Sequence, residues 1–207
     1  MGCSAISGHQ IHPGNVRPLS ALEIKTIQDM WPAVNSNKEL FGVFVYNSFL
    51  SREHEMRKLF PRMVLEDGEE KFRIDPAEVR RHALMVVEGL GLAVDYLQDN
   101  DKLNRFLRIV GTRHHHANVK PEMLTKLYPA MDEGLHDVLG KGYTKRQRQA
   151  FRSFFMYIVG VFKIAMMEAA SSSSQHAMRD IRHSNASWSS GIGTASTCST
   201  KSIKTLE

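Results

Sequence analysis

Cysteine is almost missing from this sequence: the 207 residues include only two, Cys3 and Cys198, and both lie near the ends of the chain. Two cysteines so far apart argue against a disulfide framework and against a zinc site with cysteine ligands, and they suit a reducing compartment. The longest apolar run, Phe154 to Phe162, is too short to cross a bilayer as a helix. The first residues lack the basic and then apolar pattern of a secretion signal, so we expect an intracellular protein.

Charge of one sign is not concentrated anywhere in the chain. The formal net charge of +5 is spread over the sequence, so we expect solvated faces and no nucleic-acid partner. A hydrophobic content of 42% is enough for a sizeable core. We expect one domain over residues 19–170, preceded by a leader over residues 1–18 and followed by a Ser-rich disordered tail over residues 171–207.

Sustained strand alternation is also missing, and the long segments have helical periodicity, so the expected fold class is all-α. Ser20 followed by Glu23 is typical of a capping box, and Asp75 followed by Pro76 is typical of a helix start. Gly68 and several charges predict a solvent-facing loop over residues 64–74. The first expected long helix begins at Ser20. The others span residues 38–50, 76–97, 102–116, 121–138 and 144–170.

Two histidines stand where apolar side chains are expected. His82 lies within one helical apolar stripe, and His114 ends another. Two core-facing imidazoles on separate helices can bind one metal from opposite sides, and imidazole is a common ligand of iron. The plainer alternative is a pair of core histidines that are hydrogen-bonded to the backbone. The two stripes are Val79, His82, Val86, Leu90 and Val94, and Leu103, Phe106, Leu107, Val110 and His114.

Three consecutive histidines, His114, His115 and His116, leave the identity of the second inward-facing imidazole to be decided. Each residue turns a helix by about 100°, so only one of them can share the face of Val110. The step of four from Val110 selects His114. The alternative is a surface metal chelator made of all three, which consecutive helical residues disfavour because they point apart.

The residues around these histidines resemble the globin family, in particular its neuroglobin-like members. Phe60, His82 and His114 follow one another at the intervals that separate a phenylalanine, the distal histidine and the proximal histidine in those globins. The segments RKLFP, RHALMVV, LAVDYL and VGTRHHHANVKP also have close globin counterparts, and the resemblance spans residues 19–170.

The resemblance implies a globin fold, in which helices pack around a pocket for haem b (iron protoporphyrin IX). It implies that His114 is the proximal ligand of the iron and that His82 is the distal histidine. Phe60 is implied to pack on the haem face, Val86 to flank the distal site and Tyr46 to line the distal pocket. The expected haem-contacting residues are Tyr46, Phe60, Val86, Leu90, Val110 and Val119.

The resemblance also implies that O2, NO or CO binds to the iron. In neuroglobin-like proteins the distal histidine can itself bind the iron, and an external ligand must then displace it. Our hypothesis is a six-coordinate, bis-histidyl haem that serves redox chemistry or sensing, with a reductase as a partner. The alternatives are a five-coordinate globin that stores or carries O2, and a haem-free interaction module. Nitrite reduction and NO dioxygenation are secondary activities that the family includes.

The first residues, MGCSAISG, are suited to lipid attachment. Gly2 can accept myristate and Cys3 can accept palmitate, although Ile6 stands where Ser or Thr is preferred. A second acyl chain matters, because one myristoyl group holds a protein to a membrane only marginally. This start also resembles globin X, a membrane-anchored branch of the family. We expect a membrane-associated protein held by its lipid anchor, and a cytoplasmic one without the anchor.

Overall fold

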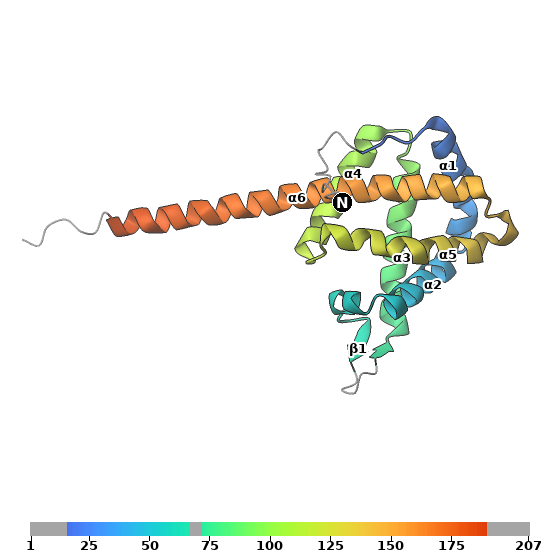
Figure 1. Ribbon diagram of the computed structural model, residues 1–207, viewed down its shortest axis with the longest axis horizontal. Helices are drawn as coiled ribbons and strands as arrows, with labels where there is room; N and C mark the ends of the chain where they lie inside the picture. The colour runs from blue at the N-terminus through green and yellow to red at the C-terminus, as the bar shows by residue number, and fades with distance from the viewer. Residues whose placement is uncertain (1–15, 67–71, 190–207) are drawn as a thin grey trace, which may run out of the picture. The chain divides into compact units, whose positions relative to one another are not determined.

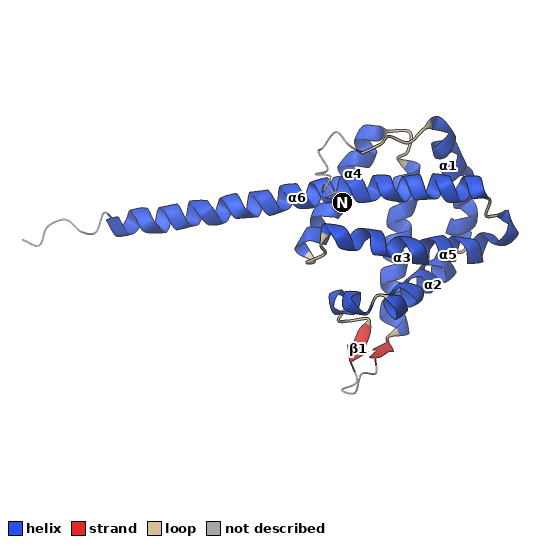
Figure 2. Cartoon of the chain, viewed as in Figure 1, coloured by secondary structure: helices blue, strands red, loops and turns tan. Residues whose placement is uncertain are grey.

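The computed structural model describes residues 16–66 and 72–189 of the chain, which divides into two compact units, Met1–Ala169 and Ala170–Glu207. Gly2 and Cys3 lie outside the described residues, so lipid attachment stays a prediction. Helices make up most of the described chain, which confirms the all-α class (Figures 1 and 2). The elements are α1 (Ala21–Ser36), α2 (Lys38–Arg52), η1 (His54–Leu59), β1 (Val64–Glu66), β2 (Phe72–Ile74), α3 (Pro76–Asp95), α4 (Asn100–His116), η2 (Pro121–Leu127), α5 (Tyr128–Leu139), η3 (Gly140–Gly142) and α6 (Lys145–Ser189).

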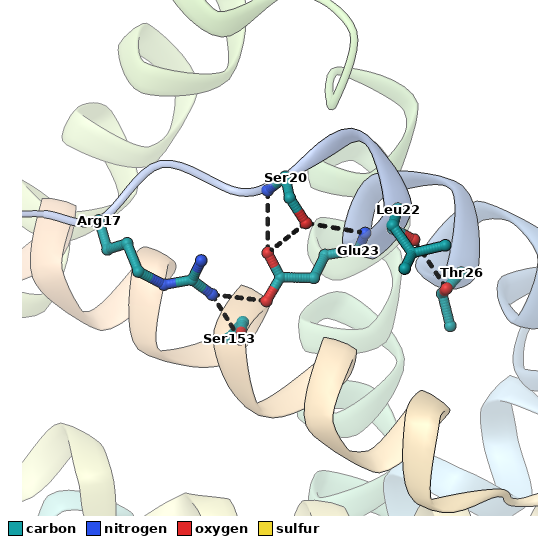
Figure 3. Close-up of polar contacts among 6 residues, drawn as sticks. All are labelled: Arg17, Ser20, Leu22, Glu23, Thr26 and Ser153. Carbon is teal, nitrogen blue, oxygen red and sulfur yellow. Dashed lines mark hydrogen bonds and ion pairs between the residues drawn. The ribbon is translucent and has the colours of Figure 1, made fainter.

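The start of α1 is fixed by hydrogen bonds around Glu23 (Figure 3). The Ser20 hydroxyl accepts the N–H of Glu23 at 3.3 Å, and the Glu23 carboxylate accepts the N–H of Ser20 at 2.8 Å. The predicted capping box is therefore confirmed. The Arg17 guanidinium donates to the same carboxylate, which adds a charge-assisted hydrogen bond to the cap.

The residues just before α1 are tied to α6. The Arg17 guanidinium also donates to the hydroxyl of Ser153 on α6 at 2.9 Å. Val16 lies over Gly160 of the same helix, where a Cβ on the glycine would stand 2.8 Å from a methyl of Val16. One polar and one apolar contact thus hold this short segment against the helical domain.

Replacing Glu23 with glutamine should lower the free energy of unfolding at pH 7 by about 1–2 kcal/mol, because a neutral amide is a weaker partner for Ser20 and Arg17. Burial alone would raise the pKa of Glu23, but hydrogen bonds from Arg17, Ser153 and Ser20 outweigh it and lower the pKa to about 2. A carboxyl whose pKa is lowered on folding stabilises the protein above its unfolded pKa, about 4.3, and this contribution is lost as the pH falls toward the folded value.

Urea unfolding of the wild type and the Glu23→Gln variant between pH 7 and pH 3 measures this difference, which should shrink below about pH 4.3. The matched control is Asp29→Asn, which breaks an exposed ion pair of 2.9 Å with Lys25. An exposed pair contributes little, so the control should change stability by less than about 0.5 kcal/mol. Equal losses in the two variants would argue against a special role of the cap.

Two glycines let helices approach one another closely. A Cβ at Gly42 of α2 would lie 2.9 Å from the Cβ of Ala83 on α3. A Cβ at Gly111 of α4 would lie 2.9 Å from the Cα of Phe162 and 3.0 Å from the Cβ of Ala165, both on α6. Neither contact leaves space for a side chain, so each fixes where two helices cross. Among the largest fully buried side chains of the core are Ile27, Phe41, Leu50, Met56, Phe151 and Phe154.

The loop predicted over residues 64–74 is wrong at both of its ends. Strands β1 and β2 form an antiparallel hairpin in which Val64 pairs with Ile74 and Leu65 with Arg73. Val64 is 7% exposed, so the hairpin contributes to the core. Strands of three residues are too short for apolar alternation to appear in the sequence. Gly68, on which the loop prediction rested, lies outside the described residues.

The single helix predicted over residues 121–138 is also wrong, because the structure divides it into η2 and α5. Pro129 is the reason. In a helix interior it would remove a backbone hydrogen bond and clash with the carbonyl of Thr125. In the first turn of α5, where it lies, the missing N–H has no helical partner to lose.

Helix α6 ends at Ser189, whereas the sequence predicted a disordered tail from residue 171 onward. Residues 171–189 contain neither proline nor glycine, so no residue there stops a helix outright. Residues 190–207 of that tail lie outside the described part of the chain. The stretch Lys145–Ser172 has the length and the mean hydropathy, 1.5, of a membrane-crossing helix, but 67% of its apolar window is buried inside the fold. Core packing therefore accounts for its apolar residues.

Candidate functional site

His82 lies on α3, whose start the sequence specifies. The Asp75 carboxylate accepts the N–H groups of Ala77 at 2.9 Å and Glu78 at 3.3 Å. From this start, Val79 falls in the core with 1% exposure, and His82, one turn later, is half-buried. Val86 and Leu90 follow His82 at steps of four and therefore share its face of the helix.

An aromatic cluster surrounds His82. Its Nε2 lies 3.0 Å from the hydroxyl oxygen of Tyr46 on α2, and the two rings meet edge-on with centroids 4.9 Å apart. The ring of Phe60, directly after η1, lies 5.5 Å from the imidazole and 5.8 Å from the Tyr46 ring. Phe49 of α2 contacts both Tyr46 and Phe60 edge-on. Such edge-to-face contacts favour one arrangement of the rings, so His82 is held in a defined position.

The electrostatic environment keeps His82 neutral. Burial lowers its pKa to about 4, and the charges of Arg81 and His114 contribute in the same direction. A neutral imidazole has a lone pair on one ring nitrogen, which a metal ligand requires. Burial also raises the pKa of Tyr46, so its hydroxyl keeps its proton.

His114 lies in the last turn of α4, and its Nδ1 is 2.8 Å from the carbonyl oxygen of Val110. A carbonyl can only accept a hydrogen bond, so Nδ1 carries the hydrogen and the lone pair of the neutral ring is on Nε2. The Phe162 ring of α6 lies against the imidazole with centroids 4.9 Å apart. The N–H of Val119 donates to the His114 carbonyl at 3.1 Å. These contacts orient Nε2 in advance as a metal ligand.

The other two histidines of the run are placed differently. His115 and His116 contact each other edge-on, with ring centroids 5.5 Å apart, and His116 is exposed. Across the part of the chain that the structure describes, no group of three or more His, Cys, Asp or Glu side chains could hold a metal ion. A chelator built from all three histidines is therefore contradicted.

Most of the apolar side chains expected to contact haem are less buried than the centre of the core, and Tyr46, at 5% exposure, is the exception. Core side chains such as Val79 and Leu107 are at most 2% exposed. In contrast, the expected haem-contacting residues Phe60, Val86, Leu90, Val110 and Val119 are all only half-buried.

Half-buried apolar walls beside two imidazoles suit a flat, apolar group that brings its own in-plane metal ligands. Haem is such a group, and it needs from a protein an axial imidazole, an apolar pocket and distal polar groups. His114 supplies the imidazole, and Tyr46 and His82 supply the distal polar groups. The residues therefore fit haem.

A hollow of about 300 Å³ where α2, α5 and α6 meet includes none of the predicted site residues. Asp132 on its wall pairs with Arg148 at 3.2 Å, and Glu133 pairs with Arg52 at 2.6 Å. Walls of paired charges do not suit an apolar cofactor, so we place the functional site at the histidines.

Sequence patterns missed two features of this site. Phe162 ends the longest apolar run of the sequence, but its contact with His114 joins helices far apart in sequence, which periodicity does not reveal. Tyr46 was predicted to line the distal pocket, but its hydrogen bond to His82 was not foreseen. The close crossing of α2 and α3 at Gly42 brings the two together, and a lone glycine in a helix was the only signal of it.

Comparisons with known proteins agree with this geometry. The globin family model matches residues 43–162, which is more than half of the chain. Cytoglobin-2 of Oryzias latipes is 31% identical over 103 residues, and the match covers 49% of this chain and 56% of that protein, so the chain spans only about half the length of this relative. Hemoglobin subunit alpha-D of Meleagris gallopavo is 26% identical over 144 residues, which cover 69% of this chain and 95% of that protein.

A solved structure shows the same fold. The crystal structure of a hexacoordinated heme protein from an anhydrobiotic tardigrade at pH 4 matches with a TM-score of 0.63 and 16% identity, and it covers 72% of this chain and 96% of that chain. At this identity the likeness concerns the fold alone, and it confirms the expected globin fold. Since the family model also covers the positions of Tyr46, His82 and His114, we conclude that this chain is a member of the globin family, which implies haem binding.

Proposed function

We propose that this globin binds haem b through two histidines, His114 on the proximal side and His82 on the distal side. The hydrogen bond from Nδ1 of His114 to the carbonyl of Val110 carries the proposal, because it leaves the lone pair of Nε2 free to bind iron. The neutral imidazole of His82 offers a second nitrogen lone pair to the metal. Bound haem would supply an iron that cycles between the ferric and ferrous states and binds O2, NO or CO.

The other residues of the pocket have two tasks. The half-buried apolar side chains of Phe60, Val86, Leu90, Val110 and Val119 cover the cofactor and exclude water. An external ligand must displace His82 before it can bind. The apparent affinity for that ligand is therefore the intrinsic affinity multiplied by the fraction of molecules in which the site is open. That property suits redox chemistry or sensing, supported by a reductase, better than bulk transport of O2.

A second candidate function is reversible storage of O2 on a five-coordinate ferrous haem. One observation favours it: Nε2 of His82 has a partner within the protein, the Tyr46 hydroxyl. In this case His82 would stay off the iron and only stabilise an external ligand. The two functions therefore differ in the ligation state of His82.

Visible absorption spectra separate these functions. The haem-loaded wild type, ferric and dithionite-reduced, should give low-spin bands, and His82→Leu should turn them high-spin because the sixth ligand is lost. His116→Leu, which changes an exposed histidine, is the matched control and should leave the bands unchanged. A five-coordinate ferrous wild type would support O2 storage, and no uptake of haem would leave only a haem-free interaction module.

We further propose that acyl chains on Gly2 and Cys3 hold the protein at a membrane. The support is the MGC start, which offers a myristate site beside a palmitate site. Together the two chains anchor a protein stably, whereas a single myristoyl chain does not.

Fractionation of cells that express the full chain tests the anchor. The wild type should sediment with membranes, and Gly2→Ala should move most of the protein to the soluble fraction, because without myristate one acyl chain at most remains. Gly8→Ala, a glycine change outside the acceptor position, should stay with the membranes. The cells are supplied with a myristate analogue that labels acylated protein. A wild type that is found in the soluble fraction of these cells would contradict the proposed anchor.

A further inference from the structure

The Tyr46 hydroxyl contacts the nitrogen through which His82 would bind iron. This hydroxyl lies 3.0 Å from Nε2 of His82, and the Tyr46 side chain is 5% exposed, so water does not satisfy the hydroxyl in place of the imidazole. Among the described side chains, His82 is the hydrogen-bond partner of this hydroxyl. The inference that follows rests on the proposed haem function.

The direction of this hydrogen bond decides its consequence. A hydroxyl that keeps its proton needs an acceptor, and an imidazole nitrogen without hydrogen is one. When Tyr46 donates to Nε2, the lone pair of that nitrogen is engaged, and the hydrogen of the neutral ring is on Nδ1. The same lone pair cannot bind iron at the same time.

The packing of α2 on α3 makes the contact persistent. Gly42, one turn before Tyr46, lies against Ala83, the residue after His82, without space for a Cβ. The Tyr46 ring also meets Phe49 and Phe60 edge-on, with centroids 6.4 Å and 5.8 Å away. The hydroxyl is thus presented to His82 by a tightly packed backbone and by ring contacts on two sides.

We propose that Tyr46 is a positioning residue that competes with the haem iron for Nε2 of His82. If His82 left a bound haem iron, the bond between Nε2 and the metal would break and the hydrogen bond from Tyr46 would form, while the proton would stay on the tyrosine oxygen. The hydroxyl therefore stabilises the open site and raises the fraction of molecules that can take an external ligand.

The test is Tyr46→Phe in the haem-loaded full chain, which keeps the ring contacts and removes the hydroxyl. A net hydrogen bond of ordinary strength corresponds to a roughly two- to tenfold change in an equilibrium constant, so the ratio of His82-bound to His82-free ferrous iron should rise by this factor. Absorption spectra report the ratio. Rapid mixing with CO at several concentrations gives the rates of release and return of His82, and the ratio of return to release should rise by the same factor.

Two controls isolate the effect. Tyr143→Phe removes another buried hydroxyl, which donates to Asp132 at 2.8 Å away from the histidines, and it should leave the ratio unchanged. Adding Tyr46→Phe to His82→Leu shows any direct effect of the hydroxyl on bound CO, which is then subtracted. Nitrogen-15 NMR of the CO-bound wild type, in which His82 is off the iron, should show hydrogen on Nδ1 and none on Nε2.

The outcomes separate this inference from the proposed function. If the wild type is low-spin and Tyr46→Phe leaves the ratio of His82-bound to His82-free iron unchanged or lowers it, the competition is overturned. Bis-histidyl ligation is then still supported. A five-coordinate wild type whose Tyr46→Phe variant becomes low-spin overturns bis-histidyl ligation of the wild type and supports the competition. The competition is also overturned if the wild type and the Tyr46→Phe variant are both five-coordinate. The same holds if NMR finds hydrogen on Nε2 of His82, or if the protein takes up no haem.

Discussion

A His114→Gly variant is expected to lose haem more than about 100-fold faster than the wild type. Removing an outer partner of a metal-bound histidine already costs 10- to 100-fold in affinity, so removal of the ligand itself should exceed that range. The expected cause is specific, because His114 is the histidine whose Nδ1 bonds to Val110 and leaves Nε2 free. Haem transfer to an excess of a haem-accepting protein, followed by the change in visible absorption, gives the rate.

Two further measurements make this result specific. Imidazole added to His114→Gly should occupy the space of the missing side chain and slow the loss of haem. His115→Gly, one residue along the same helix, should retain haem almost as well as the wild type, because its ring contacts His116 instead. If His115→Gly loses haem and His114→Gly does not, the proximal assignment is wrong.

The second large effect is expected at Gly111, where α4 crosses α6. A valine there should lower the free energy of unfolding by about 3 kcal/mol or more, because its Cβ would stand 2.9 Å from the Cα of Phe162. The obstacle is backbone, so no rotamer change relieves it. For a domain of this size the loss corresponds to a fall in melting temperature of roughly 10 °C. Calorimetry or thermal unfolding followed by circular dichroism measures it.

Gly89 of α3 is the matched control for Gly111. It is also inside a helix, but a Cβ there would meet nothing within 4 Å. Gly89→Ala should therefore raise stability by about 0.5–1 kcal/mol, since alanine favours the helix and has the space it needs. Losses of similar size at both positions would mean that helix crossing is not what Gly111 provides.

Local chemistry explains which parts of this fold could be predicted from sequence. Ser20 with Glu23, and Asp75 with Pro76, specify helix starts through contacts within one turn, and both starts are found where they were expected. The apolar stripe around His82 likewise needs only the helical repeat. Interactions within a few residues thus determine the helices and the faces on which the histidines lie.

The features that sequence patterns missed depend on contacts between distant segments. The pairing of Val64 with Ile74 stabilises strands too short to have a periodic pattern. The orientation of His114 depends partly on Phe162, and that of His82 on Tyr46, each from another helix. The break before α5 was predictable in principle, because Pro129 stands in the sequence, but helical periodicity on both sides concealed it.

The contacts of Val16 and Arg17 with α6 have a practical consequence for anyone who shortens or fuses this chain. A globin domain cut at residue 19, where the family resemblance begins, would lose the hydrogen bond from Arg17 to Ser153 and the packing of Val16 over Gly160. A domain that starts at residue 15 keeps both. Fusion partners and purification tags therefore belong before residue 16, where they leave the contacts of Val16 and Arg17 with α6 intact.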